Sequence, residues 1–250
     1  MLQVTELLKG LELSDITEVE RLVSPTPDPL WALAMPADRS FDRWHLATQK
    51  AKRFGYLPVG VGSTDDLNYL QAHLDNNNSW DSSENIRLAT QLNLKNWFSE
   101  RHQDLEEDNE GSFPRGVWPT NIGPKNSFWF PFDRQGNHLD PWWMLLVPAQ
   151  ESWLAPISLA YGNWNECPAA YVHAALLQYW GQRFGASLAG ISGDTVEMSI
   201  DNPPSTQEES LSLALEHYLY CPDIVDQGCE TIEHLAALLM NGHAWSFWWD

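Results

Sequence analysis

Hydrophobic positions recur at helical spacing in the last third of the chain. Thr206 and Glu209 are spaced as in a capping box, so a helix is predicted to begin there, and the apolar residues that follow have a period close to 3.6 residues. An earlier helix is predicted from Pro168, which suits a first helical turn, to Gly185, which suits a helix end. A third helix is predicted over residues 231–240. Three helices are therefore expected in this part of the chain.

Alternating and continuous apolar runs predict strands around these helices. Residues 186–191 and 195–200 are joined by Ser-Gly-Asp, a turn composition, and the second run alternates apolar and polar residues, so the two form a predicted β-hairpin. A terminal strand is predicted at residues 245–250. This order of elements predicts a C-terminal α-β-β-α-α-β domain.

The pattern in the first half predicts a β-α-β unit. An apolar strand at residues 30–35 precedes a helix at 40–54 and a second strand at 56–61, with Gly55 as the helix stop. The crossover of such a unit is right-handed. The glycines here lack the spacing of a phosphate-binding loop, so a nucleotide site is not expected.

Further elements are predicted between these two parts. Helices are expected at residues 64–74 and 83–98, and short aromatic or apolar strands at 127–130 and 142–147. Residues 101–126 are acidic at first and then rich in Gly, Pro and Trp, which predicts a long loop.

The domain organisation follows from the breaks in this pattern. Three prolines within five residues form a stiff connector that separates an N-terminal helical segment, residues 1–24, from the rest. An N-terminal α/β part is predicted over residues 30–126, including the acidic loop, and a C-terminal α/β domain over 127–250; the two can also form one continuous globule. The predicted fold class is α/β (α+β), with a mixed β-sheet flanked by helices.

The composition predicts a globular protein that is located in the cytoplasm. Of the 250 residues, 43% are hydrophobic, which is enough for a substantial core, and 14 are Trp. The three cysteines do not make an even disulfide framework, and neither a signal peptide nor an apolar run of about 18 residues is visible. We therefore expect a reducing cytoplasm as its location.

The net charge of −20 narrows the choice of partner. With only 14 Lys and Arg residues, the chain is not expected to bind nucleic acid or an anionic membrane surface. Acids must cluster to steer a basic protein toward the chain, because evenly spread charges mainly aid solubility. The candidate binding residues form the visible cluster Asp104, Glu106, Glu107, Asp108 and Glu110. The alternative for this cluster is a solvated loop.

Metal binding is one chemical option. Cys167, His217, Cys221 and Asp223 are ligand types suited to zinc, and Glu166 could join them. His217 and Cys221 are four residues apart and would share one face of a helix. A structural zinc site typically uses paired ligand motifs, so the alternative is that these cysteines and the histidine are core residues. No cofactor is expected, with zinc as the alternative.

A cysteine nucleophile is the other chemical option. Cys221 would lie at the C-terminal end of a helix, where the helix dipole raises the pKa of a thiol, whereas Cys167 lies at a helix N-terminus, which lowers it. The candidate catalytic group is therefore Cys167 as nucleophile, His217 as base and Asp223 as the group that orients the base.

Several motifs occur in a characteristic order in the last hundred residues. They are Trp164-Asn165-Glu166-Cys167-Pro168, Arg183-Phe184-Gly185-Ala186, residues 201–204, Glu216-His217 with Cys221-Pro222-Asp223, and Phe247-Trp248-Trp249-Asp250. In this order they resemble a bacterial domain-of-unknown-function family with a Trp-rich FWWD ending, over residues 145–250. The resemblance implies an α/β domain and supplies neither an activity nor catalytic residues.

Three functions are compatible with these observations. The first is a non-catalytic acidic interaction protein, similar to an immunity or inhibitor protein, that binds a basic partner. The second is a metal-dependent or Cys/His hydrolase that uses Cys167, His217, Cys221 and Asp223. The third is a structural domain of a larger assembly. The acidic charge and the lack of a complete catalytic motif favour the first.

Overall fold

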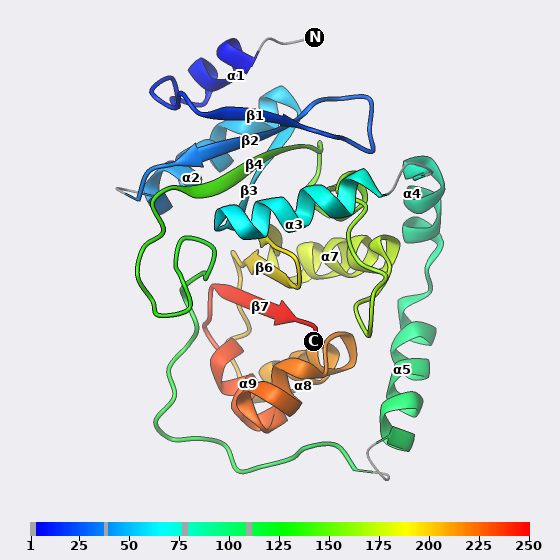
Figure 1. Ribbon diagram of the computed structural model, residues 1–250. Coiled ribbons are helices and arrows are strands. Elements are labelled where there is room, and N and C mark those ends of the chain that lie inside the picture. Colours follow the sequence, from blue (N-terminus) through cyan, green and yellow to red (C-terminus); the bar gives the residue numbers. More distant parts are fainter. Residues whose placement is uncertain (1–3, 38–39, 77–79, 109–111) are drawn as a thin grey trace.

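One seven-stranded mixed β-sheet forms the centre of the computed structural model, which describes residues 4–37, 40–76, 80–108 and 112–250 (Figure 1). The strand order is β1-β2-β4-β3-β5-β6-β7. Among the described strands, β3 and β5 pair in parallel, and the other neighbours are antiparallel. The strands are β1 (Val19–Leu22), β2 (Leu30–Met35), β3 (Tyr56–Gly62), β4 (Trp142–Pro148), β5 (Ser187–Ile191), β6 (Thr195–Ser199) and β7 (Ala244–Trp248). The predicted fold class, a mixed sheet flanked by helices, is confirmed.

Helices cover both faces of this sheet. They are α1 (Val4–Gly10), α2 (Ser40–Ala51), α3 (Thr64–Asp75), α4 (Ser82–Gln91), α5 (Leu94–Asp108), α6 (Ala155–Ser158), α7 (Ala170–Phe184), α8 (Gln207–Tyr220) and α9 (Ile232–Leu239). Three short helical turns accompany them, η1 (Lys52–Phe54), η2 (Ser152–Leu154) and η3 (Ile224–Cys229). In the described part of the chain, none of the helices is long and apolar enough to cross a membrane.

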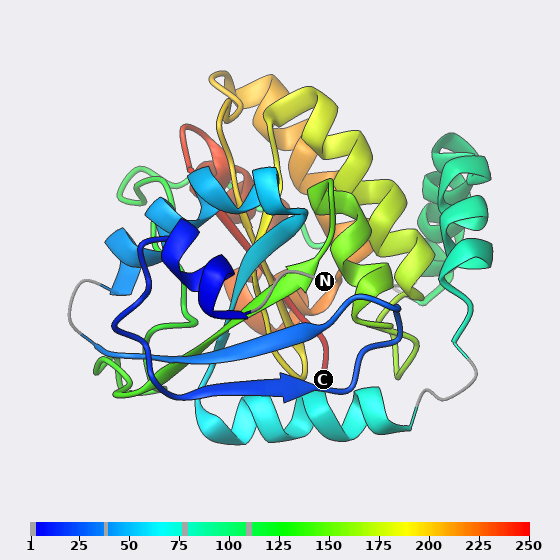
Figure 2. The same ribbon diagram turned by 90° about the horizontal axis from the view of Figure 1, so that it is seen from above.

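The sheet separates two hydrophobic cores. Side chains of α3, α7, α8 and α9 share one core with alternate residues of the strands, among them Leu145 and Phe247. Side chains of α1 and α2 share the other with the intervening strand residues, such as Leu33 and Met144. Figure 2 shows α3 on one side of β1 and β2, with α1 and α2 on the other. The period-2 alternation of the strands directs neighbouring apolar side chains of a strand into opposite cores.

The predicted β-α-β unit is present, but another strand lies inside it. β2, α2 and β3 follow one another as expected, and Gly55 (φ 77°) ends the helical segment before β3. β4 lies between β2 and β3 and is antiparallel to both, so that Leu145 pairs with Ala32 on one side and Val59 on the other. The two parallel strands of the unit are therefore held together by a strand that comes some 80 residues later in the sequence.

The C-terminal elements follow the predicted order. α7, β5, β6, α8, α9 and β7 give the sequence α-β-β-α-α-β, and Gly185 (φ 64°) ends α7. Thr206 caps α8 as predicted, because its hydroxyl accepts a hydrogen bond from Glu209 N at 3.2 Å. The Glu209 carboxylate accepts instead from Ser205 N, so the capping box is only half formed.

Two predicted elements are corrected by the structure. Residues 19–22 are an edge strand and not part of a helix, because they pair antiparallel with β2. The helix predicted at 83–98 is two helices, and Asn93 starts the second, since its side-chain oxygen accepts from Asn96 N. This second helix, α5, continues to Asp108. The first residues of the predicted loop at 101–126 are therefore helical.

The aromatic run at 127–130 is also not a strand. The ring of Phe130, in this run, lies over Gly60 of β3 and Gly190 of β5, which pair with each other across the two parallel strands. A Cβ atom at either glycine would collide with that ring. The glycines leave a shallow recess in the sheet, and the aromatic side chain fills it. The segment 124–130 is thereby fixed against β3, β5 and β6.

Candidate functional site

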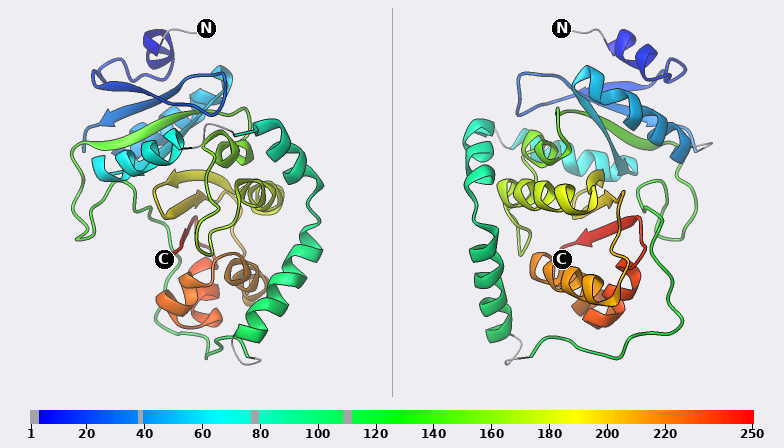
Figure 3. Two further views of the ribbon diagram at one scale, coloured as in Figure 1. Left: turned by 45° about the vertical axis from the view of Figure 1, so that its right-hand side comes forward. Right: turned by 180° about the vertical axis from the view of Figure 1, so that it is seen from behind.

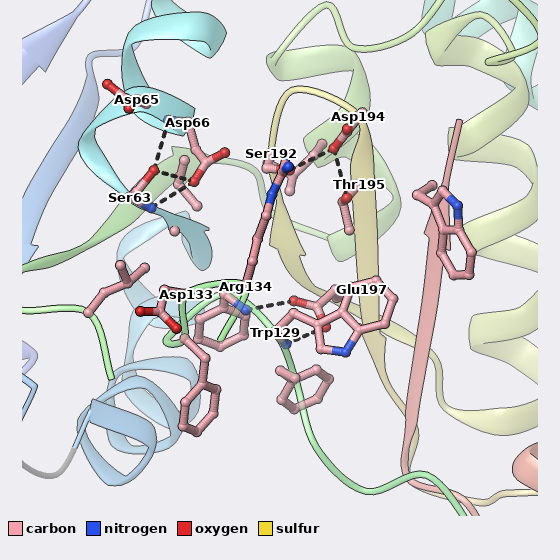
Figure 4. Close-up of a pocket in the computed structure, with 18 of the residues that line it drawn as sticks. Ser63, Asp65, Asp66, Trp129, Asp133, Arg134, Ser192, Asp194, Thr195 and Glu197 are labelled. Atoms are coloured by element: carbon pink, nitrogen blue, oxygen red, sulfur yellow. Dashed lines mark hydrogen bonds between the residues drawn. The ribbon is translucent and has the colours of Figure 1, made fainter. Parts of the chain in front are cut away.

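A cavity of about 1040 Å³ opens where β3 and β5 end (Figure 4). These two strands are the parallel pair of the sheet, and their carboxyl ends lead into Ser63 and Ser192, both of which line the cavity. In open α/β sheets, ligands bind in the crevice at the carboxyl ends of the strands. The remaining walls come from the segment 127–139, the start of β6 and the end of β7.

Glu197 on β6 forms a buried part of the lining and is only 2% exposed. Its carboxylate accepts hydrogen bonds from Trp129 N (2.7 Å), Phe130 N (3.0 Å) and Ser246 Oγ (3.2 Å). Burial raises the pKa of this carboxyl, while the hydrogen bonds act in the opposite direction. The Glu197 carboxylate therefore accepts the hydrogen bonds of two backbone amides, Trp129 N and Phe130 N, that the carbonyl groups of a paired strand would otherwise accept.

Lys125 lies beside this carboxylate. Its Nζ donates a hydrogen bond to Ser246 Oγ at 2.5 Å and lies 4.0 Å from the centre of the Trp129 ring. Burial lowers the pKa of Lys125 to about 8, and the charge of Glu197 opposes that shift. The chain Lys125, Ser246, Glu197 ties the segment 124–130 to β6 and β7, so these groups have a structural role in the wall of the cavity.

Two tryptophans form an aromatic wall. Trp129 and Trp248 have ring centroids 5.5 Å apart, and Trp129 is 45% exposed although it is a large aromatic residue. Aromatic faces attract organic cations, and the attraction is strongest for Trp.

Carboxylates surround the mouth of the cavity. Asp66 Oδ2 accepts hydrogen bonds from Ser63 N (2.8 Å) and Ser63 Oγ (2.6 Å) and so caps α3, while the neighbouring Asp65 is exposed. Across the cavity, Asp194 is exposed and accepts a hydrogen bond from Thr195 Oγ1 at 2.9 Å. Within the described residues, neither Asp65 nor Asp194 forms an ion pair. Their negative charges remain uncompensated by direct contact.

Of the motifs in the last hundred residues, the final one reaches the cavity, because Trp248 lines it, and a family model matches the region that contains all of these motifs. Residues 143–250 match DUF4253, a domain of unknown function. The resemblance to such a family is thereby confirmed. Comparisons with curated proteins and with solved structures gave no match.

The DUF4253 region does not build the cavity alone. It supplies the β5–β6 hairpin, Glu197 and Trp248, whereas Asp65, Trp129 and Asp133 precede it in the chain. The cavity is therefore a joint product of the matched region and the residues before it.

The candidate nucleophile Cys167 lies within the DUF4253 region and contacts a histidine that the sequence did not single out. Cys167 Sγ is 3.5 Å from His173 Nε2, and His173 Nδ1 is 2.5 Å from the hydroxyl of Tyr220. All three side chains are buried. Burial raises the pKa of the Cys167 thiol and lowers that of His173 to about 3. His173 follows Cys167 by six residues, and this short separation is the signal that could have pointed to it.

The candidate base His217 has a different environment, also inside the DUF4253 region. Its ring is buried among Trp180, Trp245 and Phe247, with ring centroids 4.5–4.9 Å apart. Burial lowers its pKa well below the ordinary value. Its Nε2 atom has no hydrogen-bond partner among the described residues.

The other candidate ligands are also engaged separately. Cys221 Sγ donates to Trp248 O at 2.8 Å, Asp223 accepts from Asp250 N at 3.0 Å, and Glu166 lies 3.4 Å from Arg101. Within the described ranges, no three His, Cys, Asp or Glu side chains are grouped so that they could hold a metal ion. The candidate residues Cys167, His217, Cys221, Asp223 and Glu166 therefore contact different partners, and the contacts of the described residues do not join them in one site.

The acidic cluster predicted as a binding segment lies mostly on α5, outside the DUF4253 region. Asp104, Glu106 and Glu107 are exposed, and Glu106 is 3.4 Å from His102 Nδ1. Asp108 ends the helix, and Glu110 lies outside the described residues. Figure 3 shows α5 at the side of the molecule opposite the segment that bounds the cavity. The two acidic surfaces therefore face different directions.

Proposed function

We propose that the protein is a non-catalytic acidic binding protein, of the immunity or inhibitor type, and that it receives a basic side chain of a partner protein in the cavity at the ends of β3 and β5. The observation that carries this proposal is the joint presence of an exposed tryptophan wall and of unpaired carboxylates around one cavity. A ring face and a carboxylate both attract a cation, and a desolvated cation over a Trp ring gains about 2 kcal/mol.

The overall charge supports the same type of partner. A net charge of −20 attracts a basic protein over the Debye length of about 8 Å at physiological salt and repels acidic ones. An inhibitor of this type would cover a basic surface of its partner and insert one cationic side chain into the cavity. The −20 charge guides the encounter, and the cavity supplies the specific contact.

The geometry gives less support to the hydrolase alternative. A cysteine nucleophile reacts as the thiolate, and burial keeps Cys167 a neutral thiol and His173 a neutral imidazole. Cys167 as a whole is also only 4% exposed, which leaves little access for a substrate. The pair fits a hydrogen-bonded core network better than an activated nucleophile.

The proposal is tested with two charge-matched variants. Asp65→Asn with Asp194→Asn removes two charges at the cavity, and Asp104→Asn with Glu107→Gln removes two charges on α5. Binding of a short arginine- and lysine-rich peptide is followed by tryptophan fluorescence at two salt concentrations. We expect the cavity variant to weaken binding about tenfold, because each lost charge contact is worth about 0.2–1 kcal/mol, and the α5 variant to bind as the wild type does.

The outcomes distinguish the two surfaces. Loss of binding in the α5 variant alone would assign the contact to the cluster at residues 104–110. Binding that is insensitive to salt, or no binding of the basic peptide at all, would contradict the proposal. Thermal unfolding of both variants serves as the control for an intact fold.

A further inference from the structure

Arg134 lines the cavity from a tightly fixed turn. The Asp133 carboxylate accepts hydrogen bonds from Gln135 N (2.9 Å), Asn137 N (2.8 Å) and Asn137 Nδ2 (3.0 Å), and Gly136 takes a positive φ of 82°. These contacts fix the backbone from which Arg134 projects. In Figure 4 its side chain extends across the cavity toward Ser192 and Asp194.

The guanidinium of Arg134 differs from those of the other described arginines in the contacts that it makes. Each of the other arginines in the described ranges forms an ion pair, a hydrogen bond or a contact with an aromatic ring, as Arg183 does with Glu216 and Arg87 with Glu84. Among the residues that the structure describes, no such contact involves Arg134, although the cavity around it is lined by carboxylates. The side chain is therefore directed into the cavity without being held there.

We infer that the cavity takes an arginine side chain of the partner, and that Arg134 stands in for that side chain in the free protein. This inference rests on the proposed function. The hydroxyls of Ser192 and Thr195 and the carboxylates of Asp65 and Asp194 are acceptors on different sides of the cavity. A planar guanidinium with five donors can use acceptors on several sides and can stack on a Trp ring, whereas an ammonium is a compact point charge.

The time that Arg134 spends in the cavity determines how much it weakens the binding of a partner. A partner can enter only in the fraction of molecules in which Arg134 has swung out, so the apparent affinity is reduced by that fraction. If Arg134 occupies the cavity in about 70–90% of molecules, its removal strengthens binding about three- to tenfold. Because Arg134 forms no ion pair that must be broken before it leaves the cavity, we do not expect it to reduce the affinity for a partner more than this.

The experiment uses the full chain and two small probes, N-acetyl-arginine amide and N-acetyl-lysine amide, titrated by tryptophan fluorescence. The variants are Arg134→Ala and, as a control with the same charge change, Arg87→Ala on α4, which is exposed and away from the cavity. We expect R134A to bind the arginine probe about three- to tenfold more tightly than the wild type does. R87A should bind it as the wild type does, and the lysine probe should bind less tightly than the arginine probe.

Each other outcome has a definite meaning. Weaker binding by R134A, or equal gains in R134A and R87A, would overturn the role of Arg134 as an occupant. Equal affinity for the two probes would overturn the preference for a guanidinium. If the wild type and R134A bind equally well and D65N with D194N abolishes binding, the proposed function stands and this inference fails. If none of the proteins binds either probe or the basic peptide, the proposed function fails with it.

Discussion

Two buried histidines make the stability of the protein sensitive to acid. His173 is 2% exposed with a pKa near 3, and His217 is 1% exposed with a pKa well below its usual value. A histidine in the unfolded chain takes up a proton below about pH 6.5. The unfolded state therefore binds more protons than the folded state in weak acid, and the folded state loses stability relative to it.

We expect the free energy of unfolding to be constant with respect to these groups above about pH 6.5 and to fall as the pH drops from there toward 3. The contribution of each buried histidine to the slope is about 1.4 kcal/mol per pH unit. Urea titrations at a series of pH values measure the slope, and His173→Gln should reduce it by the share of one group while retaining an amide that can contact Tyr220. An equal slope in the variant would show that His173 becomes protonated in the folded state.

At the residue scale, the sequence reveals residue types better than their partners. Cys167 and His217 were singled out as chemically capable, but their neighbours depend on how distant segments pack. Glu197 lies between two apolar residues of a strand and has the pattern of a solvent-facing position. It is buried because the segment 124–130 covers it and supplies two backbone donors. No local spacing contains that information.

Among the elements, the contact between Phe130 and the parallel strand pair positions one wall of the cavity. Phe130 lies where Gly60 and Gly190 leave room, and its neighbour Trp129 forms the aromatic wall. A side chain at Gly60 would force the ring outward and displace the tryptophan with it.

We therefore expect Gly60→Ala to cost about 1–3 kcal/mol of unfolding free energy, as overpacking of a filled site does. It should also weaken binding of the basic peptide, because Trp129 moves. Gly123→Ala is the control, since a Cβ atom there would meet no atom within 4 Å. Urea unfolding and the fluorescence titration provide the two measurements, and equal stability of the two variants would contradict the packing argument.

The elements that the sequence predicted well are those specified by local pattern. The β5–β6 hairpin, α7 with its Gly185 end and the strand β2 all follow from periodicity and turn residues close in the chain. Two failures have a common cause. The run 127–130 has strand composition but lies against glycines without pairing, and β1 depends on β2 for its hydrogen bonds. Both outcomes are decided by tertiary contacts.

For the whole molecule, the position of β4 joins the DUF4253 region to the residues before it. β4 opens that region in the sequence, yet it pairs with β2 and β3, and β5 joins the sheet through β3. The matched region therefore has its first strand inserted in a part of the sheet built by earlier residues.

We expect a fragment of residues 143–250 to lack a cooperative unfolding transition, because β4 would lose both neighbours and leave backbone groups and apolar side chains such as Leu145 without partners. The full chain should unfold in one step. Circular dichroism and tryptophan fluorescence during urea unfolding test both statements. A fragment that unfolds cooperatively, with the near-UV signal of ordered tryptophans, would show that the matched region folds independently.

The interleaving of β4 also determines when the first half of the molecule can form during synthesis. β2 and β3 have no hydrogen bonds to each other in the sheet: β2 pairs with β1 and β4, and both partners of β3, β4 and β5, come later in the chain. A ribosome that has released residues 1–140 has therefore produced α2 and α3 but no strand to hold β3. The nascent chain must wait, with the apolar faces of these helices uncovered, until about residue 148 has emerged. The protein is thus expected to need protection from aggregation during the first three fifths of its translation.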